Sequence, residues 1–479
     1  MRAPARARII GRLALCSGLL LLGGCATLRT TLSGYATGAN GIARPQQRLR
    51  DALARGDFKA ALGWHEDDEL LRRLDVGIAS YYAAQFERSA AVLDSAALLA
   101  DDRITASLSK DALALMTSDL ARPYQPRRTE RLFIPYYALL AYARLGQWED
   151  AAVEARRLSS LLAQYADDRD DRERALHGTL HELAGAVFER AGEQGDAAVA
   201  YRAARALVPA FAADSARRWR VAAGGDSGDV LVVVERGYVA HRVTETIELD
   251  FEMDDRDSLR VRDGGWGSAG EHRNASATVS TVSTGRPLPV PSTFVPARRR
   301  HVHDDDDEYH MTIAFPALRR SARPWGATVR AGTEGDTLGV GGVAAHVDDA
   351  SAADERRESG AIIARAAARA ATKYALVKAV RDKKGEVAGT LANFGASLLE
   401  RADVRSWHLL PSELTLVRLR LPAGSQRVIL RIGEGSQART VVVGTVQVRA
   451  GSVDVAPVRL WQAPLPEPVA APDSLQPRP

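Results

Sequence analysis

Three short motifs carry residue types that could do chemistry, and the first is Gly225-Asp226-Ser227-Gly228. This motif matches the nucleophile signature of trypsin-like serine proteases, which also need a histidine base and an oriented aspartate. The upstream histidines, His65, His177 and His181, stand in helical patterns, whereas the protease histidine stands in a strand-loop context. We therefore interpret the motif as a linker between domains.

The second motif runs from His301 to His310 and places His301 and His303 beside the acidic residues 304–308. Alternating imidazoles and carboxylates could hold zinc or another divalent ion. The four adjacent aspartates repel one another, however, and the spacing is not that of a closed tetrahedral site. A solvated acidic loop is the favoured interpretation, and metal binding is its alternative.

The third motif, Gly339-Val340-Gly341-Gly342-Val343-Ala344, echoes a dinucleotide fingerprint but lacks the helix that should follow it. It indicates a loop or a strand edge. The chain has no Gly-x-Ser-x-Gly elbow, no His-Glu-x-x-His pair and no phosphate-binding P-loop. We therefore predict a non-catalytic protein with no cofactor and no metal site.

The elements that position these motifs begin with a helical region over residues 46–220, in which helix-turn-helix junctions recur. The junctions lie at Gly56, Gln85, Gly146 and Gly192, and the last is the fullest match to tetratricopeptide spacing. Small residues let paired helices approach, and aromatic residues fill the gaps between pairs. The irregular spacing predicts a short, decorated solenoid, with a generic helical bundle as the alternative.

Strand patterns follow, as in the apolar run Val230 to Val234 and the alternating run Val243 to Phe251. The predicted fold class is α+β, with a tetratricopeptide-like α-solenoid followed by a β-sandwich-like domain into which a helical hairpin is inserted. The expected segments are a signal peptide (1–24), a tether (25–45), the helical domain (46–220), the two β parts (228–347 and 403–462), the hairpin (348–402) and a Pro-rich disordered tail (463–479).

Composition and charge exclude some classes of function. The 479 residues are 46% hydrophobic and 26% charged, which is ordinary for a folded protein and excludes global disorder. The formal net charge of +4 is mild, and no basic run resembles a nucleic-acid-binding arm. We therefore expect no nucleic-acid partner.

The N-terminus predicts where the protein resides. A positive stretch, Arg2 to Arg12, precedes the apolar run Leu13 to Leu22, which is too short to span a bilayer. The sequence Leu22-Gly23-Gly24-Cys25 resembles a bacterial lipobox, so Cys25 would become the lipidated N-terminus, anchored by several acyl chains. Because Ala26 and not aspartate follows Cys25, the outer membrane is the expected destination. An ordinary secretory signal is the alternative.

Two blocks of the sequence resemble an uncharacterised family of bacterial outer-membrane lipoproteins with N-terminal tetratricopeptide-like repeats and a C-terminal β domain. The first block is Leu113 to Tyr124, continuing through Glu130-Arg131 to residues 153–157. The second combines Ala367 to Tyr374 with Asp403 to Pro411 and Val417 to Gly424. The resemblance implies a fold and a cellular location, and it implies no activity.

The residues that we expect to bind a partner lie in the third helical pair. Arginine and tyrosine side chains in a solenoid groove would suit an acidic or glycan partner. Glu154 and Arg157 can also pair within one helix. The alternative is that these side chains hold neighbouring helices together, and Trp407 is likewise expected to be a core anchor. The set comprises Glu130, Arg131, Tyr136, Tyr137, Glu154, Arg156 and Arg157.

These patterns together predict a lipid-anchored lipoprotein on the periplasmic face of the outer membrane. Its expected role is to scaffold envelope proteins through the helical groove, in envelope or peptidoglycan assembly. The first alternative is an envelope module that binds glycan or another ligand through its β domain. The second is a metal-dependent enzyme that uses His301 and His303.

Overall fold

The computed structural model describes residues 42, 44–107, 122–212, 226–253, 259–261, 279–281, 308–320, 328–335, 340–362, 364–365, 402–434 and 438–461. Cys25, the predicted signal peptide, the Pro-rich tail and the pair His301 and His303 lie outside these residues. The chain forms two compact units, Met1–Trp64 and His65–Pro479. Among the described residues, no helix is both long enough and apolar enough to cross a bilayer.

The first unit contains helices α2 (Arg44–Ala54) and α3 (Phe58–Leu62), which meet at the predicted junction around Gly56. Asp57 caps α3, because its Oδ1 accepts a hydrogen bond of 3.1 Å from the backbone N–H of Ala60. Such a cap satisfies one of the N–H groups that the first turn of a helix leaves unpaired. The described residues of this unit thus form a short helical pair.

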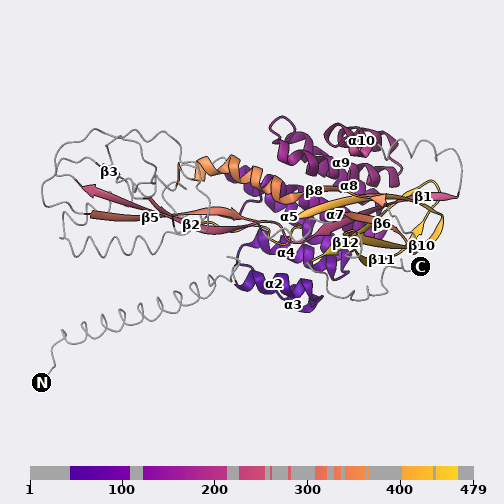
Figure 1. Cartoon of the computed structure of the whole chain (residues 1–479), viewed down its shortest axis with the longest axis horizontal. Helices are drawn as coiled ribbons and strands as arrows, with labels where there is room; N and C mark the ends of the chain where they lie inside the picture. Colours follow the sequence, from indigo (N-terminus) through magenta and orange to yellow (C-terminus); the bar gives the residue numbers. More distant parts are fainter. Residues whose placement is uncertain are drawn as a thin grey trace, which may run out of the picture. The chain divides into compact units, whose positions relative to one another are not determined.

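In the second unit, six helices form three antiparallel hairpins, α4/α5, α7/α8 and α9/α10 (Figure 1). Their turns lie where the sequence predicts junctions. Gly146 ends α7 with a φ of 74°, a left-handed conformation that favours glycine. The helices are α4 (Glu69–Tyr82), α5 (Phe86–Ser107), α7 (Arg128–Leu145), α8 (Trp148–Gln164), α9 (Arg174–Arg190) and α10 (Gln194–Leu207), and the short η2 (Asp171–Glu173) precedes α9.

Two four-stranded sheets follow the helices. The first has the order β12-β1-β9-β8, in which β12 pairs parallel to β1 and the other pairs are antiparallel. The second has the order β11-β10-β6-β7 and is antiparallel. The strands are β1 (Ser227–Arg236), β6 (Val329–Thr333), β7 (Val340–Gly341), β8 (Val343–His346), β9 (Glu413–Pro422), β10 (Gly424–Ile432), β11 (Arg439–Val448) and β12 (Val453–Leu460).

The two sheets share one apolar core. Alternate residues of β1, Val230, Val232 and Val234, belong to a buried cluster with Val428 and Leu430 of β10. Because side chains alternate along a strand, the intervening residues of β1 lie on its other face. They are buried too, since β1 is covered on both faces, and this explains its continuous apolar run.

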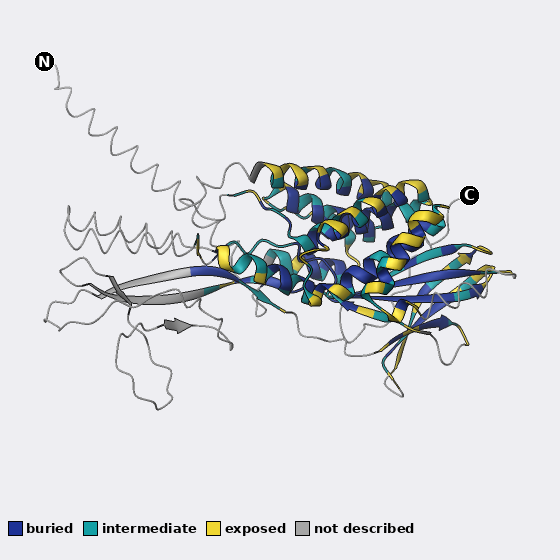
Figure 2. Cartoon of the chain, turned by 90° about the horizontal axis from the view of Figure 1, so that it is seen from above, coloured by how far each residue is buried: buried dark blue, intermediate teal, exposed yellow. Residues whose placement is uncertain are grey.

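The helical hairpins cover that second face of β1. Each first helix reaches the strands through a polar side chain, Tyr82 of α4, Tyr137 of α7 or Glu189 of α9. The second helices, α5, α8 and α10, carry the exposed apolar residues Leu98, Val153 and Val199. Figure 2 shows the exposed residues of these helices on the side away from the strands. Helix and sheet are thus mixed in one unit, consistent with the predicted α+β class.

A third group of strands is a ribbon of β2 (His241–Met253) and β5 (Glu308–Arg319), joined along twelve antiparallel pairs. Two short strands, β3 (Leu259–Val261) and β4 (Val279–Thr281), also pair with β2. Residues 347–362 form a helix that begins directly after β8, where the sequence predicts the first helix of a hairpin. Residues 366–401, which contain most of that predicted hairpin, lie outside the described residues. The acidic residues of the helix 347–362 contact the start of the ribbon, as described below.

Candidate functional site: the two sides of helix α7

Helix α7 lies at the centre of the hairpin layer, and different groups of residues contact its two sides and its N-terminus. The carboxylate of Glu130 closes the first turn by accepting a hydrogen bond of 2.8 Å from the backbone N–H of Arg127. Pro135 lies inside the helix and removes one backbone donor there. The seven residues predicted to bind a partner lie on α7 and α8.

Tyrosine side chains on the side of α7 that faces the sheet bind one buried carboxylate, that of Glu235 in β1. Tyr137 Oη donates to Glu235 Oε1 at 2.7 Å, Tyr136 Oη donates to the same oxygen at 3.1 Å, and Tyr82 Oη donates to Oε2. The guanidinium of Arg459 lies 3.9 Å from Glu235 and donates to the carbonyls of Gly237 and Leu409. We refer to Glu235, Arg459 and the three tyrosines as the Glu235 cluster.

Within the Glu235 cluster, Tyr136, Tyr137 and Glu235 have no exposed surface, and Tyr82 is half-buried. Burial and the charge of Glu235 raise the pKa of all three tyrosines well above the usual value, so they stay protonated and donate. A buried carboxylate is tolerated only when it is paired and hydrogen-bonded. The cluster meets that condition and joins α4, α7, β1 and β12.

Glu130 joins α7 to the second sequence block in the same way. Its Oε1 accepts from the backbone N–H of Trp407 at 2.7 Å, and its Oε2 accepts from Tyr124 Oη at 2.7 Å. Burial raises the pKa of Glu130. Trp407 has no exposed surface and packs near the ring of Tyr137, so it is a core anchor, as predicted.

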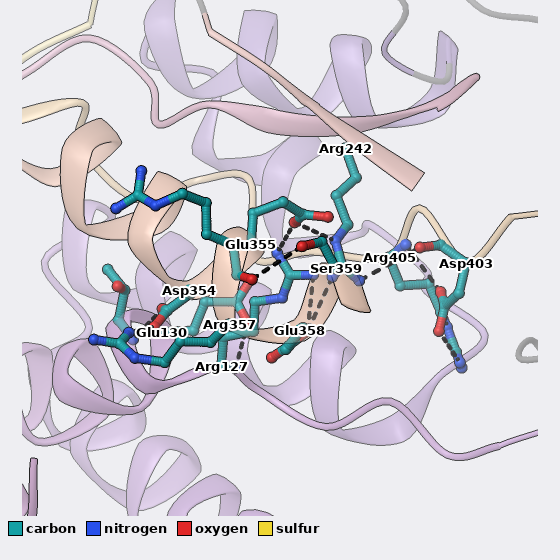
Figure 3. A network of polar contacts seen from close by, with 12 residues as sticks. Arg127, Glu130, Arg242, Asp354, Glu355, Arg357, Glu358, Ser359, Asp403 and Arg405 are labelled. Carbon is teal, nitrogen blue, oxygen red and sulfur yellow. Dashed lines mark hydrogen bonds and ion pairs between the residues drawn. The ribbon is translucent and has the colours of Figure 1, made fainter. Parts of the chain in front are cut away.

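The N-terminus of α7 lies in a network of ion pairs (Figure 3). Arg127, just before α7, and Arg242 of β2 converge on the same two carboxylates, Glu355 and Glu358 of the helix 347–362. The four N···O distances are 2.5, 3.1, 3.1 and 3.1 Å. We refer to these four residues as the Arg127 network.

Asp354, the residue before Glu355, is buried. Its Oδ2 accepts from the backbone N–H of Thr129 at 2.8 Å, and its Oδ1 accepts from Arg357 at 3.1 Å. Burial raises the pKa of Asp354 to about 6, although the hydrogen bonds from Thr129 and the charge of Arg127 act in the opposite direction. The start of α7, the start of β2 and the helix 347–362 are therefore held together by charge.

These contacts bear directly on the predicted partner-binding residues. Glu130, Tyr136 and Tyr137 are buried, and each of them binds a residue of this chain's own strands or loops. A partner at the molecular surface could not touch the two tyrosine rings unless this packing opened. The side of the hairpins formed by their first helices is occupied by the chain's own sheet.

The opposite side of α7 lines a groove that is open to solvent. The groove has a volume of about 150 Å³ and lies between α5, α7 and α8. Two of the predicted residues, Arg131 and Arg157, lie in its wall. The lining consists of Ala97, Ala100, Asp101, Arg131, Ile134, Pro135, Arg157, Ser160, Leu161 and Gln164.

The two arginines of the groove bind different side chains. Arg131 donates to Tyr165 Oη at 3.0 Å and to Asp101 Oδ1 at 3.0 Å. Arg157 lies 3.2 Å from Oε1 of Glu154, one turn earlier on α8, and its side chain is 34% exposed. Burial raises the pKa of Glu154. The predicted pairing of Glu154 with Arg157 is therefore present.

Arg156, the remaining predicted residue, does not line the groove. It donates to Glu193 at 2.5 Å and lies over the ring of Phe188, between α8 and the third hairpin. The structure thus divides the seven predicted residues into three that face the sheet or the α7 N-terminus, three around the groove and one elsewhere.

Sequence reasoning missed a buried arginine between the sheet and the third hairpin. Arg418 of β9 donates to Asp229 at 2.6 Å, to Tyr201 of α10 at 3.0 Å and to Glu189 of α9 at 3.0 Å. Burial alone would lower the pKa of Arg418, but its contacts with Tyr201, Glu189 and Asp229 raise it instead. Tyr201 reaches this position because it packs on Gly185, where a Cβ would lie 2.6 Å from the tyrosine ring.

The sequence signal for such a residue is clear at Glu235 and ambiguous at Arg418. Glu235 extends an apolar run in β1, and Arg418 interrupts one in β9. A charge beside a continuous apolar run, as at Glu235, indicates a strand that is covered on both faces and a charge that needs a partner. The alternation around Arg418 is by itself equally typical of a strand with one face in solvent.

The three short motifs that could carry chemistry lie in strands or outside the described residues. Ser227 is the first residue of β1, and its Oγ accepts from Arg420 Nε at 3.1 Å. Gly341 ends β7, as the strand-edge interpretation predicts. His301 and His303 lie outside the described residues, and within the described part no three histidine, cysteine or acidic side chains group as metal ligands would.

Comparisons of the chain with models of known protein families, with curated proteins and with solved structures found no match. The resemblance to a family of outer-membrane lipoproteins therefore stays a prediction from the sequence.

Proposed function

We propose that this protein is a lipid-anchored scaffold on the periplasmic face of the outer membrane, which binds envelope proteins through the groove between α5, α7 and α8. The single observation that carries this proposal is the open groove with Arg131 and Arg157, on the side of the hairpins away from the sheet. In this proposal the hairpins are tetratricopeptide-like and the two packed sheets are β-sandwich-like.

The proposed cellular location rests on the sequence. The apolar run before Leu22-Gly23-Gly24-Cys25 suits a lipoprotein signal, and acyl chains on Cys25 would anchor the protein. A tether of residues 25–45 would separate the anchor from the helices. Envelope proteins, including those that assemble peptidoglycan, are the partners within reach of such an anchor.

The buried side of the hairpins supports the choice of surface. Helical hairpin repeats commonly offer a concave surface to a partner. Here Glu235 and Arg418 of the chain's own sheet bind the helices that would line such a surface. The groove on the opposite side combines a hollow with cationic side chains.

No specific observation favours the two alternatives. Recognition of a glycan by the β domain would need exposed aromatic rings. Of the aromatic residues described in or beside the two sheets, Trp407 is buried, and Tyr238 and Trp461 lie around the guanidinium of Arg459. The metal-dependent enzyme depends on His301 and His303, for which the structure offers no geometry.

The proposal is tested by photo-crosslinking in cells. A photoreactive amino acid at Ser160 in the groove should capture defined envelope proteins, identified by mass spectrometry. The matched control carries the same amino acid at Val199, which is 60% exposed on α10. Capture from Ser160 should disappear when Arg157→Glu is added. Equal capture from both positions, or capture that is insensitive to Arg157→Glu, would refute the groove as the functional surface.

A further inference from the structure

The residues that line the groove between α5, α7 and α8 include more cationic than anionic side chains. Its charged lining consists of the guanidinium groups of Arg131 and Arg157 and the carboxylate of Asp101. Guanidinium groups bind carboxylates through paired, charge-assisted hydrogen bonds. Glu154, which pairs with Arg157, is only 7% exposed, whereas Arg157 is 34% exposed. An occupant of the groove therefore meets the guanidinium group and not the carboxylate, and an anionic occupant is favoured over a cationic one.

Arg131 already holds a carboxylate at the mouth of the groove. Its Nη2 lies 3.0 Å from Oδ1 of Asp101, whose side chain is 59% exposed. Tyr165 accepts from Nη1 and fixes the orientation of the guanidinium. Arg131 is only 16% exposed, but its partner Asp101 is largely in solvent and is held weakly, so an incoming carboxylate can replace Asp101 beside Arg131.

The floor of the groove is apolar. Ile134 and Pro135 of α7, Ala97 of α5 and Leu161 of α8 line it. On α8, the exposed Val153 lies one turn before Arg157 and extends the same stripe. A volume of about 150 Å³ is well below the roughly 300–1,000 Å³ of small-molecule pockets. It has room for a few side chains of a protein segment.

From this geometry we propose that the groove binds an acidic protein segment, in which a carboxylate contacts Arg131 and Arg157 and an adjacent apolar side chain rests on Ile134 and Pro135. This inference deepens the proposed scaffold function and rests on it. A glycan is the less suitable occupant, because none of the described lining residues is an aromatic on which a sugar ring would stack.

The test measures fluorescence anisotropy of a labelled peptide of repeating Leu-Glu-Glu, with the full chain titrated into it. The matched peptide has glutamine in place of each glutamate. Three variants are compared with the wild type. Arg157→Gln removes a cation of the groove, Asp101→Asn removes the competing carboxylate, and Arg156→Gln removes a neighbouring cation outside the groove.

We expect the wild type to bind the glutamate peptide more tightly than the glutamine peptide. Arg157→Gln should weaken binding about fivefold, equivalent to about 1 kcal/mol. Asp101→Asn should tighten it by a few-fold, and Arg156→Gln should leave it within about twofold of the wild type. Raising the salt concentration should reduce the difference between the two peptides.

Three results would overturn the inference: equal binding of the two peptides, equal effects of Arg156→Gln and Arg157→Gln, or no tightening in Asp101→Asn. Tighter competition by an oligosaccharide of glucuronic acid than by the peptide would also overturn it, in favour of a glycan. For Asp101→Asn we expect tighter peptide binding, which a damaged fold would not produce.

The outcomes separate this inference from the scaffold proposal. If crosslinks at Ser160 persist while the peptide pattern fails, the groove binds partners of another chemistry and the scaffold stands. If the peptide pattern holds while cellular crosslinks fail, the groove has the proposed chemistry and the scaffold role is wrong.

Discussion

Tyr137 of α7 donates a hydrogen bond of 2.7 Å to Glu235 of β1, across 98 residues of sequence. Both side chains are completely buried. The contact joins the central helix of the hairpin layer to the central strands of the first sheet. It therefore links a helical region and a strand region that the sequence predicts separately.

Tyr137→Phe should lower the free energy of unfolding by about 1 to 2 kcal/mol, because it removes a donor to a buried carboxylate and keeps the ring. The measurement is urea-induced unfolding at neutral pH. Tyr142→Phe is the matched control, because Tyr142 also donates to a carboxylate, Asp94, at 2.7 Å but at a more exposed position. An equal or larger loss in the control would contradict the role assigned to the Glu235 cluster.

Arg418→Lys should destabilise the protein by about 2 to 4 kcal/mol, because an ammonium cannot reproduce the fork that reaches Asp229, Tyr201 and Glu189 together. Thermal unfolding with spectroscopic detection measures the loss. Arg420→Lys, on the same strand but part-exposed, should cost less than about 1 kcal/mol. If both variants behave alike, Arg418 is not the anchor between β9 and the third hairpin.

The buried His177 should make the folded protein less stable in mild acid. Burial, reinforced by the charge of Arg169, lowers the pKa of this histidine from 6.5 to about 3. Between these values the unfolded chain binds the proton and the folded chain does not, so stability falls as pH falls below 6.5. At pH 5 this difference corresponds to about 2 kcal/mol.

His177→Gln removes that pH dependence and keeps an acceptor for Arg169, which donates to His177 Nδ1 at 3.0 Å. The stability of the wild type relative to the variant should therefore fall by about 2 kcal/mol between pH 7 and pH 5. Urea titrations at the two pH values measure it. A relative stability that does not change with pH would show that His177 takes up its proton in the folded protein.

Asp354 should make the stability of the protein depend on pH with the opposite sign. Its pKa in the folded protein, about 6, lies above the ordinary value of 3.8, so the folded state binds the extra proton between these values. Stability therefore falls as pH rises from about 4 to 6, by up to about 3 kcal/mol from this group.

Asp354→Asn should gain stability relative to the wild type as pH rises through this window, whatever constant offset the lost contact with Arg357 adds. Unfolding curves between pH 4 and pH 7 provide the measurement. Ser359→Ala, on the same helix, changes no titratable group and should shift the whole curve uniformly. Parallel curves for Asp354→Asn and the wild type would refute the assignment.

Cys25→Ser should release the protein from the membrane fraction, because no thiol remains to receive acyl chains. Fractionation of cells followed by immunoblotting measures the distribution. Cys16→Ser, in the predicted signal peptide, is the matched control and should leave the protein in the membrane fraction. Membrane association that survives Cys25→Ser would refute the lipid anchor.

Much of the local structure could be predicted from the sequence. The junctions at Gly146 and Gly192, the strand around Val230 to Val234 and the helix that begins near Asp348 have clear local signals, and the structure has elements there. Of the candidate site residues, Arg131 and Arg157 do line a groove, and the pairing of Glu154 with Arg157 follows from their spacing on one helix.

The sequence by itself determined which segments are helices and strands, because the periods of 3.6 and 2 are properties of neighbouring residues. The predicted location also rests on sequence alone, because the lipobox-like motif is a short contiguous stretch.

Only the tertiary structure decided that β12 pairs parallel to β1, that Glu235 binds three tyrosines from two helices, and that Arg127 and Arg242 share two carboxylates. These contacts join residues far apart in the chain, and no local pattern encodes which surface will cover which. The same long-range packing buried Tyr136 and Tyr137 and left Arg131 and Arg157 beside the groove, because a sheet can cover only one side of a layer of helical hairpins.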